Sequence, residues 1–201
     1  MRGRHFLLLG AVAVIALPVL AVVRMNGLST REQPTFIERV LAGGARRLTV
    51  PRTAREAVNP VSFSPEVWAE ARAHFADHCA TCHANDGSGM TDIGQNLYPK
   101  APDMRLPATQ DLTDGELYWI IENGVRLTGM PAWGAGGGND LETWKQVHFI
   151  RRLKDLTPEQ LAEMEGMNPR SPAEIREEIE DQRFLAGDPV DLAPVEELQH
   201  H

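Results

Sequence analysis

The sequence has only two cysteines among its 201 residues, and both lie in the pentapeptide Cys79-Ala80-Thr81-Cys82-His83. It has no second Cys or His pair at a similar spacing, which argues against a structural zinc site, because such sites use about four ligands. The neighbouring residues also lack strand-like alternation. A thioredoxin-like motif, which would lie between a strand and a helix, is therefore disfavoured as well.

Basic residues are outnumbered by acidic ones, 20 against 28, and they are not interleaved with aromatic residues in a stripe. This balance gives no support to nucleic-acid binding. The charge is unevenly distributed, since the stretch from Arg24 to Arg55 is predominantly basic, whereas Asp155 to His201 holds thirteen acidic residues against three arginines. Such asymmetry is typical of solvated faces or tails, and less often of a docking surface.

The pentapeptide is the attachment signature of a c-type haem. In such a site the two thiols, here those of Cys79 and Cys82, add across the haem vinyl groups as thioethers. The adjacent imidazole of His83 is then placed to bind the iron from one side. The sequence therefore predicts one covalently bound haem c and a redox role, and no catalytic side chain is assigned.

An uncharged run of 18 residues, Phe6 to Val23, follows Arg2 and Arg4 near the N-terminus. As a helix it would be about 27 Å long, close to the thickness of a bilayer core. We interpret residues 1–25 as a transmembrane anchor. The alternative is a cleaved signal segment, because Val19-Leu20-Ala21 offers small residues at a passable cleavage position.

Orientation follows mainly from the haem motif, because haem is attached to such motifs outside the cytoplasm. The expected location is the bacterial inner membrane, with the haem domain facing the periplasm, or the soluble periplasm if the segment is cleaved. The positive-inside rule argues weakly against this orientation, because several arginines follow the uncharged run. They are Arg31, Arg39, Arg46, Arg47, Arg52 and Arg55.

Residues 26–60 are interpreted as a basic linker, because they show little periodicity and contain several prolines and the pair Gly43-Gly44. Within this linker, apolar residues could form one or two amphipathic turns that rest on a membrane or a partner. These residues are Phe36, Ile37, Val40 and Leu41. Residues 61–156 are expected to form the haem domain, and residues 157–201 an acidic C-terminal extension.

Three helices are predicted in the haem domain. The first runs over 64–78, with Ser64 as its cap and Pro65 at its first position. The second opens at a capping box, Thr113-Asp114-Gly115-Glu116, and stops at Asn123-Gly124. The third runs from Asp140 to about Lys154. Between the first two lies a long irregular segment, and a flat apolar haem would give it a core to wrap.

The acidic extension contains two further helix starts, each a cap followed by proline. One is Thr157-Pro158-Glu159-Gln160 and the other is Ser171-Pro172-Ala173-Glu174. Their apolar stripes are too small for an independent core. We therefore expect both helices to pack on the haem domain or on a partner.

The iron needs a sixth ligand, and Met130 is the leading candidate. It lies 48 residues after Cys82, far enough to return over the opposite haem face. Pro131 biases Met130 toward an extended backbone, while Gly129 lets the backbone pass close to the ring. The alternatives are that Met130 is ordinary core filler and that Met104 is the ligand.

These motifs together resemble class I monohaem cytochrome c of the bacterial respiratory type. The resemblance covers about Asn59 to Leu156 and rests on the CxxCH pentapeptide, the proline-containing loop, the methionine motif and the flanking helices. It implies an all-α cytochrome c fold in which the first and last helices cross, with His83 and Met130 as axial ligands. The loop is Ala101-Pro102-Asp103-Met104, and the methionine motif is Gly129-Met130-Pro131-Ala132-Trp133.

Several secondary expectations concern the surroundings of the iron. The second ring nitrogen of His83 should donate to a backbone carbonyl, for which we favour the stretch 99–102. The pairs His74 with His78 and His200 with His201 are each too few to hold zinc alone. Possible haem-pocket residues are Tyr98, Trp119, Arg126 and Trp133.

The leading functional interpretation is electron transfer by one His/Met-ligated haem. The protein would be a membrane-tethered carrier, or the cytochrome subunit of a respiratory or dehydrogenase complex, with redox donor and acceptor proteins as partners. One alternative is a haem enzyme such as a peroxidase, which would need an open iron position. Another is a haem-based sensor or assembly factor.

Overall fold

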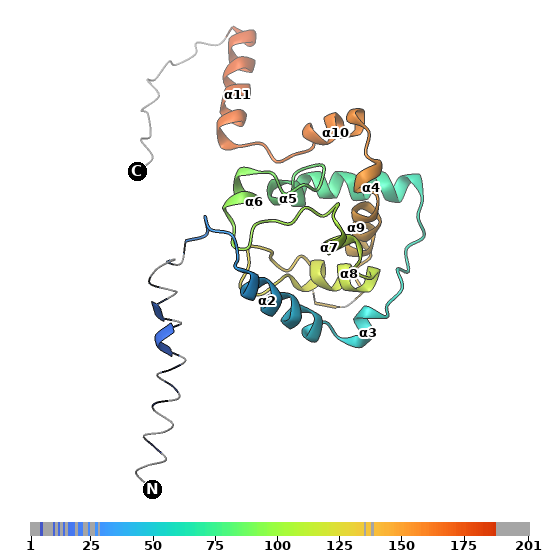
Figure 1. Cartoon of the computed structure of the whole chain (residues 1–201). Coiled ribbons are helices and arrows are strands. Elements are labelled where there is room, and N and C mark those ends of the chain that lie inside the picture. The colour runs from blue at the N-terminus through green and yellow to red at the C-terminus, as the bar shows by residue number, and fades with distance from the viewer. Residues whose placement is uncertain are drawn as a thin grey trace.

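A computed structural model describes residues 29–187, apart from 135 and 138, with the backbone alone at 46 and 47. Upstream it describes residues 5, 10, 12, 14, 16–18, 20, 21, 24 and 27. These residues form helices joined by loops, and they contain no strand (Figure 1). This architecture agrees with the predicted all-α class and fits a cytochrome c fold.

The predicted membrane segment falls mostly outside this part of the chain. Among the residues that are described, no helix is long and apolar enough to cross a membrane. Most of the run from Phe6 to Val23 belongs to the residues that the structure does not describe. The anchor therefore remains a prediction from the sequence.

The first helix of the domain is α4 (Pro65–His74), and it begins where the sequence predicts. The Ser64 hydroxyl accepts a hydrogen bond from the Val67 amide, 3.2 Å away, and Pro65 occupies the first turn. The helix continues through one π-helical turn, η1 (Phe75–Cys79), into α5 (Ala80–His83). Such π-helical turns occur frequently at functional sites, and this one leads directly into the pentapeptide.

The last helix of the domain, α9 (Leu141–Arg151), packs against α4 as the resemblance implies. In Figure 1, α4 runs across the domain while α9 is seen nearly end-on beneath it. The Phe149 ring, which is fully buried, contacts Trp68 with ring centroids 5.2 Å apart and Phe75 with centroids 4.6 Å apart. This aromatic cluster joins the two ends of the domain.

Helix α8 (Asp114–Asn123) closes the other side of the core. Its capping box is present, because the Thr113 hydroxyl accepts from the Glu116 amide at 3.2 Å and the Glu116 carboxylate accepts from the Thr113 amide at 2.9 Å. The rings of Tyr118 and Trp144 stack with centroids 4.2 Å apart, which fixes α8 against α9.

The segment between α5 and α8 is mainly irregular and contains only two short helices, α6 (Asp92–Asn96) and α7 (Pro107–Gln110). Side-chain contacts hold this segment in place. The Arg105 guanidinium forms ion pairs with the carboxylates of Asp86, at 2.7 Å, and Asp103, at 2.8 Å. The Gln110 amide donates to the carbonyls of Met104 and Ile150, at 2.7 and 2.9 Å. The segment thereby wraps around one face of the domain.

The predicted linker contains more structure than expected. Residues Phe36–Thr49 form α2, a helix of 14 residues where the sequence predicts one or two turns at most. It is followed by Val50, of which only 4% is exposed, and by the short helix α3 (Arg52–Arg55). The Thr113 hydroxyl donates to the Arg55 carbonyl at 2.8 Å, so α3 is joined to the start of α8.

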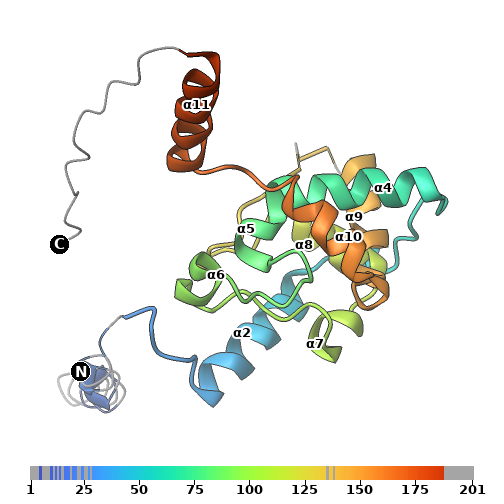
Figure 2. The ribbon, with the colours of Figure 1, turned by 90° about the horizontal axis from the view of Figure 1, so that it is seen from above.

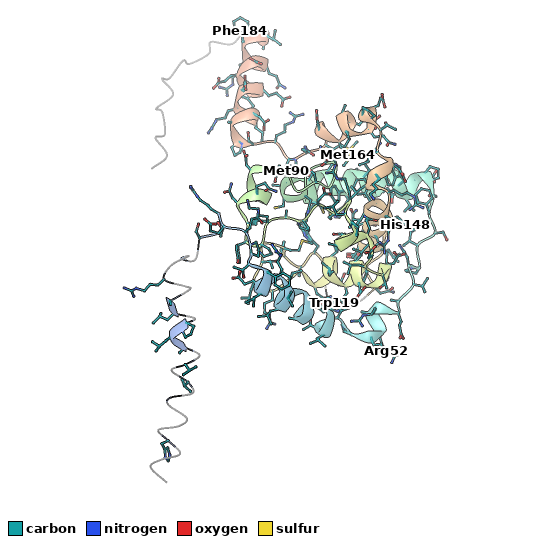
Figure 3. All side chains as sticks on the ribbon, viewed as in Figure 1. Arg52, Met90, Trp119, His148, Met164 and Phe184 are labelled. Atoms are coloured by element: carbon teal, nitrogen blue, oxygen red, sulfur yellow. The ribbon has the colours of Figure 1, made fainter. Side chains whose placement is uncertain are left out.

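The 3-10 turn η2 (Leu153–Asp155) ends the haem domain, and the acidic extension begins with helix α10 (Pro158–Glu165), whose Met164 is fully buried in the core. Helix α11 (Pro172–Ala186) starts at the predicted Ser171 cap but buries none of its residues. Figure 3 shows Phe184 at the far end of α11, away from the domain. Helix α10 thus packs on the haem domain as expected, whereas for α11 the expected packing on a partner stays a prediction.

Candidate functional site

The two cysteines lie at the end of η1 and within α5, and both thiols are unpaired and half-buried. Burial, and secondarily the neighbouring Cys82, raises the pKa of the Cys79 thiol to about 12. Cys79 therefore stays a neutral thiol at physiological pH. Because a redox-exchange cysteine needs a stabilised thiolate, this environment disfavours thioredoxin-like chemistry.

His83 is the last residue of α5, and its imidazole is largely enclosed. Burial lowers its pKa, so the ring is held in the neutral form that can ligate a metal. Its Nδ1 atom is buried and has no hydrogen-bond partner among the described residues. An imidazole that binds a metal through one ring nitrogen still needs a hydrogen-bond partner for the other, and the described structure supplies none for Nδ1.

The expected carbonyl partner for His83 is not found, so this prediction was wrong for the structure described. The stretch 99–102 lies close to the backbone of Gly89, six residues after His83. The approach is tight, because a Cβ atom added at Gly89 would be only 2.5 Å from the Ala101 carbonyl oxygen. The Gly89 amide donates to the His83 carbonyl at 2.8 Å. The loop therefore packs on the backbone after His83 and not on its imidazole.

Helix α6 lies directly against the pentapeptide. The Thr91 hydroxyl donates to the Cys82 carbonyl at 3.3 Å and accepts from the Gly94 amide at 2.9 Å. A Cβ atom at Gly94 would overlap the Cys82 carbonyl oxygen, so only glycine permits this approach. The close packing holds the end of α5 in a single position.

Met130 is half-buried and belongs to a loop that folds back on itself after α8. The Val125 amide donates to the Met130 carbonyl at 3.1 Å, and the Thr128 hydroxyl accepts from the Met130 amide at 3.1 Å. A Cβ atom at Gly129 would lie 2.6 Å from Leu97, so the loop also touches the segment that follows α6. These contacts restrict where the Met130 side chain can reach.

An aromatic contact joins the methionine loop to the segment before the pentapeptide. The Trp133 ring meets the His78 ring edge-on, with centroids 5.6 Å apart and planes at 86°. The Trp133 amide also donates to the Ile121 carbonyl of α8 at 3.1 Å. The fold thus brings a loop carrying Met130 close to the turn that carries Cys79, although the two are far apart in sequence.

Comparison with known proteins identifies this region. Residues 66–150 match the family model described as cytochrome C oxidase, cbb3-type, subunit III. This region is a c-type cytochrome domain. The match agrees with the resemblance to class I monohaem cytochromes c, and it extends from the start of α4 to the end of α9. No curated protein shows significant sequence similarity to the chain.

Cytochrome c domains bind haem c, and the donor set of this domain suits that cofactor. Two thiols three residues apart, a neutral imidazole directly after them and a thioether on a facing loop are the groups that covalent attachment and axial ligation require.

Met104, the second candidate for the sixth ligand, occupies a different environment in the cytochrome domain. Only 6% of it is exposed, and it packs within the main hydrophobic cluster. Its amide donates to the Gly87 carbonyl at 2.8 Å. Met104 therefore has a packing role in the described structure, whereas Met130 lies in a surface loop.

The other predicted pocket residues are divided between the interior and the surface. Trp119 is half-buried, whereas Arg126 is exposed and 40% of Trp133 is exposed. Tyr98 lies near the helix before the domain, where the Glu38 carboxylate of α2 influences its hydroxyl. Burial and that carboxylate raise the pKa of Tyr98.

The sequence interpretation missed Glu122, a buried carboxylate near the end of α8. Only 3% of it is exposed, and its Oε1 accepts from the Gly136 amide at 3.2 Å. The Gly134 amide donates to its backbone carbonyl at 3.1 Å. These two hydrogen bonds of Glu122 hold the glycine-rich segment that follows the methionine loop. An acid in the last turn of a helix opposes the helix dipole, and this signal could have marked it.

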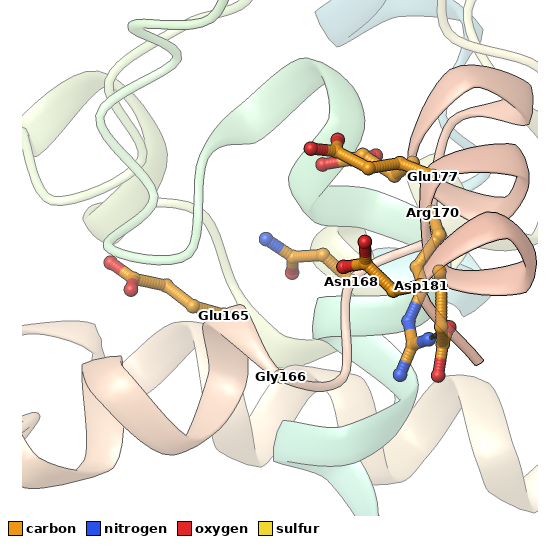
Figure 4. A pocket seen from close by; sticks show the side chains of 8 residues that line it. Glu165, Gly166, Asn168, Arg170, Glu177 and Asp181 are labelled. Carbon is orange, nitrogen blue, oxygen red and sulfur yellow. Dashed lines mark hydrogen bonds and ion pairs between the residues drawn. The ribbon is translucent and has the colours of Figure 1, made fainter. Parts of the chain in front are cut away.

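Two other features lie outside the predicted haem site. The rings of His74 and His78 stack with centroids 4.6 Å apart, but no group of three or more ligands that could hold a metal ion occurs in the described chain. An open hollow of about 430 Å³ lies between α10 and α11 (Figure 4). Its lining is mainly acidic, with Arg170 paired to Glu178.

Proposed function

We propose that this protein transfers electrons through one haem c attached to Cys79 and Cys82, with His83 and Met130 as the axial ligands. The observation that supports the proposal is the ring contact of Trp133, in the methionine loop, with His78, directly before the CxxCH pentapeptide of a c-type cytochrome domain. When bound, the haem supplies an iron that alternates between the ferrous and ferric states.

The residues of the chain set the conditions for that exchange. The neutral His83 ring and the soft thioether of Met130 favour ferrous iron, which raises the midpoint potential relative to two histidine ligands. The hydrogen bonds within the methionine loop keep Met130 in place during turnover. The buried cluster around Phe75 and Phe149 excludes water from that side of the site.

We also propose that the domain is held at the periplasmic face of the bacterial inner membrane by the run from Phe6 to Val23. Its length, its lack of charge, and Arg2 and Arg4 on its N-terminal side support this placement. The family that residues 66–150 match is named for a subunit of a cbb3-type oxidase. We therefore propose that the chain acts in a respiratory or dehydrogenase complex, or delivers electrons to one.

The test is a comparison of methionine variants of the full chain, matured in cells that attach haem c. Wild-type protein should contain one covalent haem per chain and titrate reversibly as a one-electron couple. The Met130→Ala variant should lose the sulfur-to-iron charge-transfer absorption, bind carbon monoxide in the ferrous state and show a lower midpoint potential. The Met90→Ala variant is the control, since Met90 is 71% exposed and lies in the same domain (Figure 3).

Two outcomes would contradict the assignment. If Met130→Ala left the spectrum unchanged while Met104→Leu abolished the sulfur band, Met104 would be the ligand. If the wild-type ferrous protein itself bound carbon monoxide at full occupancy, the iron would have an open position, and a haem enzyme or sensor would replace the electron carrier.

A further inference from the structure

Helix α2 presents an apolar face to solvent. Phe36 and Val40 are one turn apart, as are Ile37 and Leu41, so the four side chains share one side of the helix. Their exposed fractions are 73%, 55%, 67% and 66% respectively. Leu48, two turns after Leu41, is 88% exposed. An apolar stripe of this length on a surface helix marks a contact surface.

The opposite side of α2 is joined to the cytochrome domain. Tyr98 of the domain lies near Glu38, whose carboxylate contributes to the raised pKa of Tyr98, and Val50, directly after the helix, is buried. The next helix, α3, is held by the ion pair of Arg55 with Glu116 at 3.2 Å. The stripe therefore faces outward while the helix itself is attached to the domain, which agrees with the position of α2 in Figures 1 and 2.

The segment around α2 is positively charged, which favours a negatively charged surface as the partner of the apolar stripe. From Arg24 to Arg55 the sequence has seven arginines and only two glutamates. The only described acid on α2, Glu38, is already engaged with Thr35 and Tyr98. An apolar helix face within an arginine-rich stretch is the pattern of a helix that lies in the interface of an anionic lipid bilayer.

The short spacing between the uncharged run and α2 also favours a lipid surface as the partner of the stripe. Twelve residues, 24–35, separate the uncharged run from α2, and when fully extended they reach about 40 Å at most. If the run is in a bilayer, α2 cannot move farther than this from the lipid surface. This step rests on the membrane tether proposed above.

We propose that α2 lies on the surface of an anionic phospholipid membrane, with Phe36, Ile37, Val40 and Leu41 inserted among the headgroups and upper acyl chains. Because α2 continues directly into the buried Val50 and into α3, which is joined to α8, this contact orients the cytochrome domain relative to the membrane. The acidic helix α11 lies at the opposite end of the described structure in both views, directed away from the negative surface (Figures 1 and 2).

The experiment uses the haem-loaded full chain reconstituted into vesicles that contain anionic phospholipid, with or without bromine on the acyl chains. Single variants Phe36→Trp and Leu41→Trp place an indole on the stripe. The matched controls are Phe184→Trp on α11, where the ring is also largely exposed (74%), and Ala42→Trp, one turn after Glu38 on the other side of α2. The wild-type signal is subtracted.

Brominated lipid should reduce the fluorescence of the two stripe variants and leave both controls unchanged. If the protein sediments with the vesicles but the stripe variants are not quenched, α2 does not lie on lipid and the inference is overturned, while the tether stands. A blue-shifted but unquenched indole at position 36 would show that protein covers the face, which also overturns it. If no variant sediments with the vesicles, the tether itself fails.

Discussion

Helices α9 and α11 both begin at a capped N-terminus, Asp140 in one and Ser171 in the other, but they are held in place very differently. Helix α9 buries six of its residues against α4 and α8, whereas α11 buries none over its described length. Local capping and helix propensity are therefore enough to form a helix here, and packing decides whether it contributes to the stability of the domain.

The largest expected contrast concerns two phenylalanines. Replacing Phe149 with alanine removes a fully buried ring between Trp68 and Phe75, and should lower the free energy of unfolding by about 3–5 kcal/mol. Replacing Phe184, which is 74% exposed, should change it by less than about 0.5 kcal/mol. Denaturant titration of both haem-loaded variants measures the difference. Equal losses would show that α11 packs on the domain in solution.

A smaller contrast is expected between two caps of the same kind. Thr113 caps α8 and also donates to the Arg55 carbonyl, so Thr113→Ala should cost about 1–2 kcal/mol of global stability. Ser171 caps α11 alone, so Ser171→Ala should leave the unfolding midpoint unchanged and only speed amide hydrogen exchange in α11. A midpoint shift in the Ser171 variant would contradict the independence of α11.

The smallest expected effect is a pH dependence that arises from His74. Burial, and then the nearby His78, lowers the pKa of His74 below its ordinary value of 6.5. As pH falls through 6.5, the unfolded chain takes up a proton before the folded chain does, so stability that is complete above this pH declines below it. The decline stops once the pH is below the folded pKa. Unfolding midpoints between pH 7.5 and 5 measure it.

The control for this prediction is His74→Gln, which keeps a polar side chain at this position in α4 but cannot titrate. The difference between wild type and variant isolates His74 from the carboxylates that also titrate in acid. A variant with the same pH profile as the wild type would show that the burial of His74 has no energetic consequence.

Much of the cytochrome domain could be predicted because its signals are local. The Ser64 cap followed by Pro65, and the capping box at Thr113, each involve residues within four positions, and all appear in the structure as expected. The starts of α10 and α11 were predicted in the same way. The CxxCH pentapeptide is also local, since covalent attachment needs the two thiols and the imidazole at that spacing.

The remaining features depend on contacts between distant residues. The linker interpretation gave α2 only one or two turns because the apolar residues of this helix are exposed, and the burial of Val50 shows how the segment joins the domain. The burial of Glu122 depends on the glycine-rich chain that returns from the methionine loop. No short-range pattern encodes either arrangement.

The sequence alone determined the class of this domain, because the attachment pentapeptide and the capped helices each follow from residues that are near neighbours. Only the tertiary structure decided how these parts meet: Trp133 against His78, α6 closed upon Cys82, and α2 attached to the domain with its apolar face outward. The physical reason is that packing and burial depend on residues brought together by the whole fold, whereas caps and covalent chemistry act within a few positions.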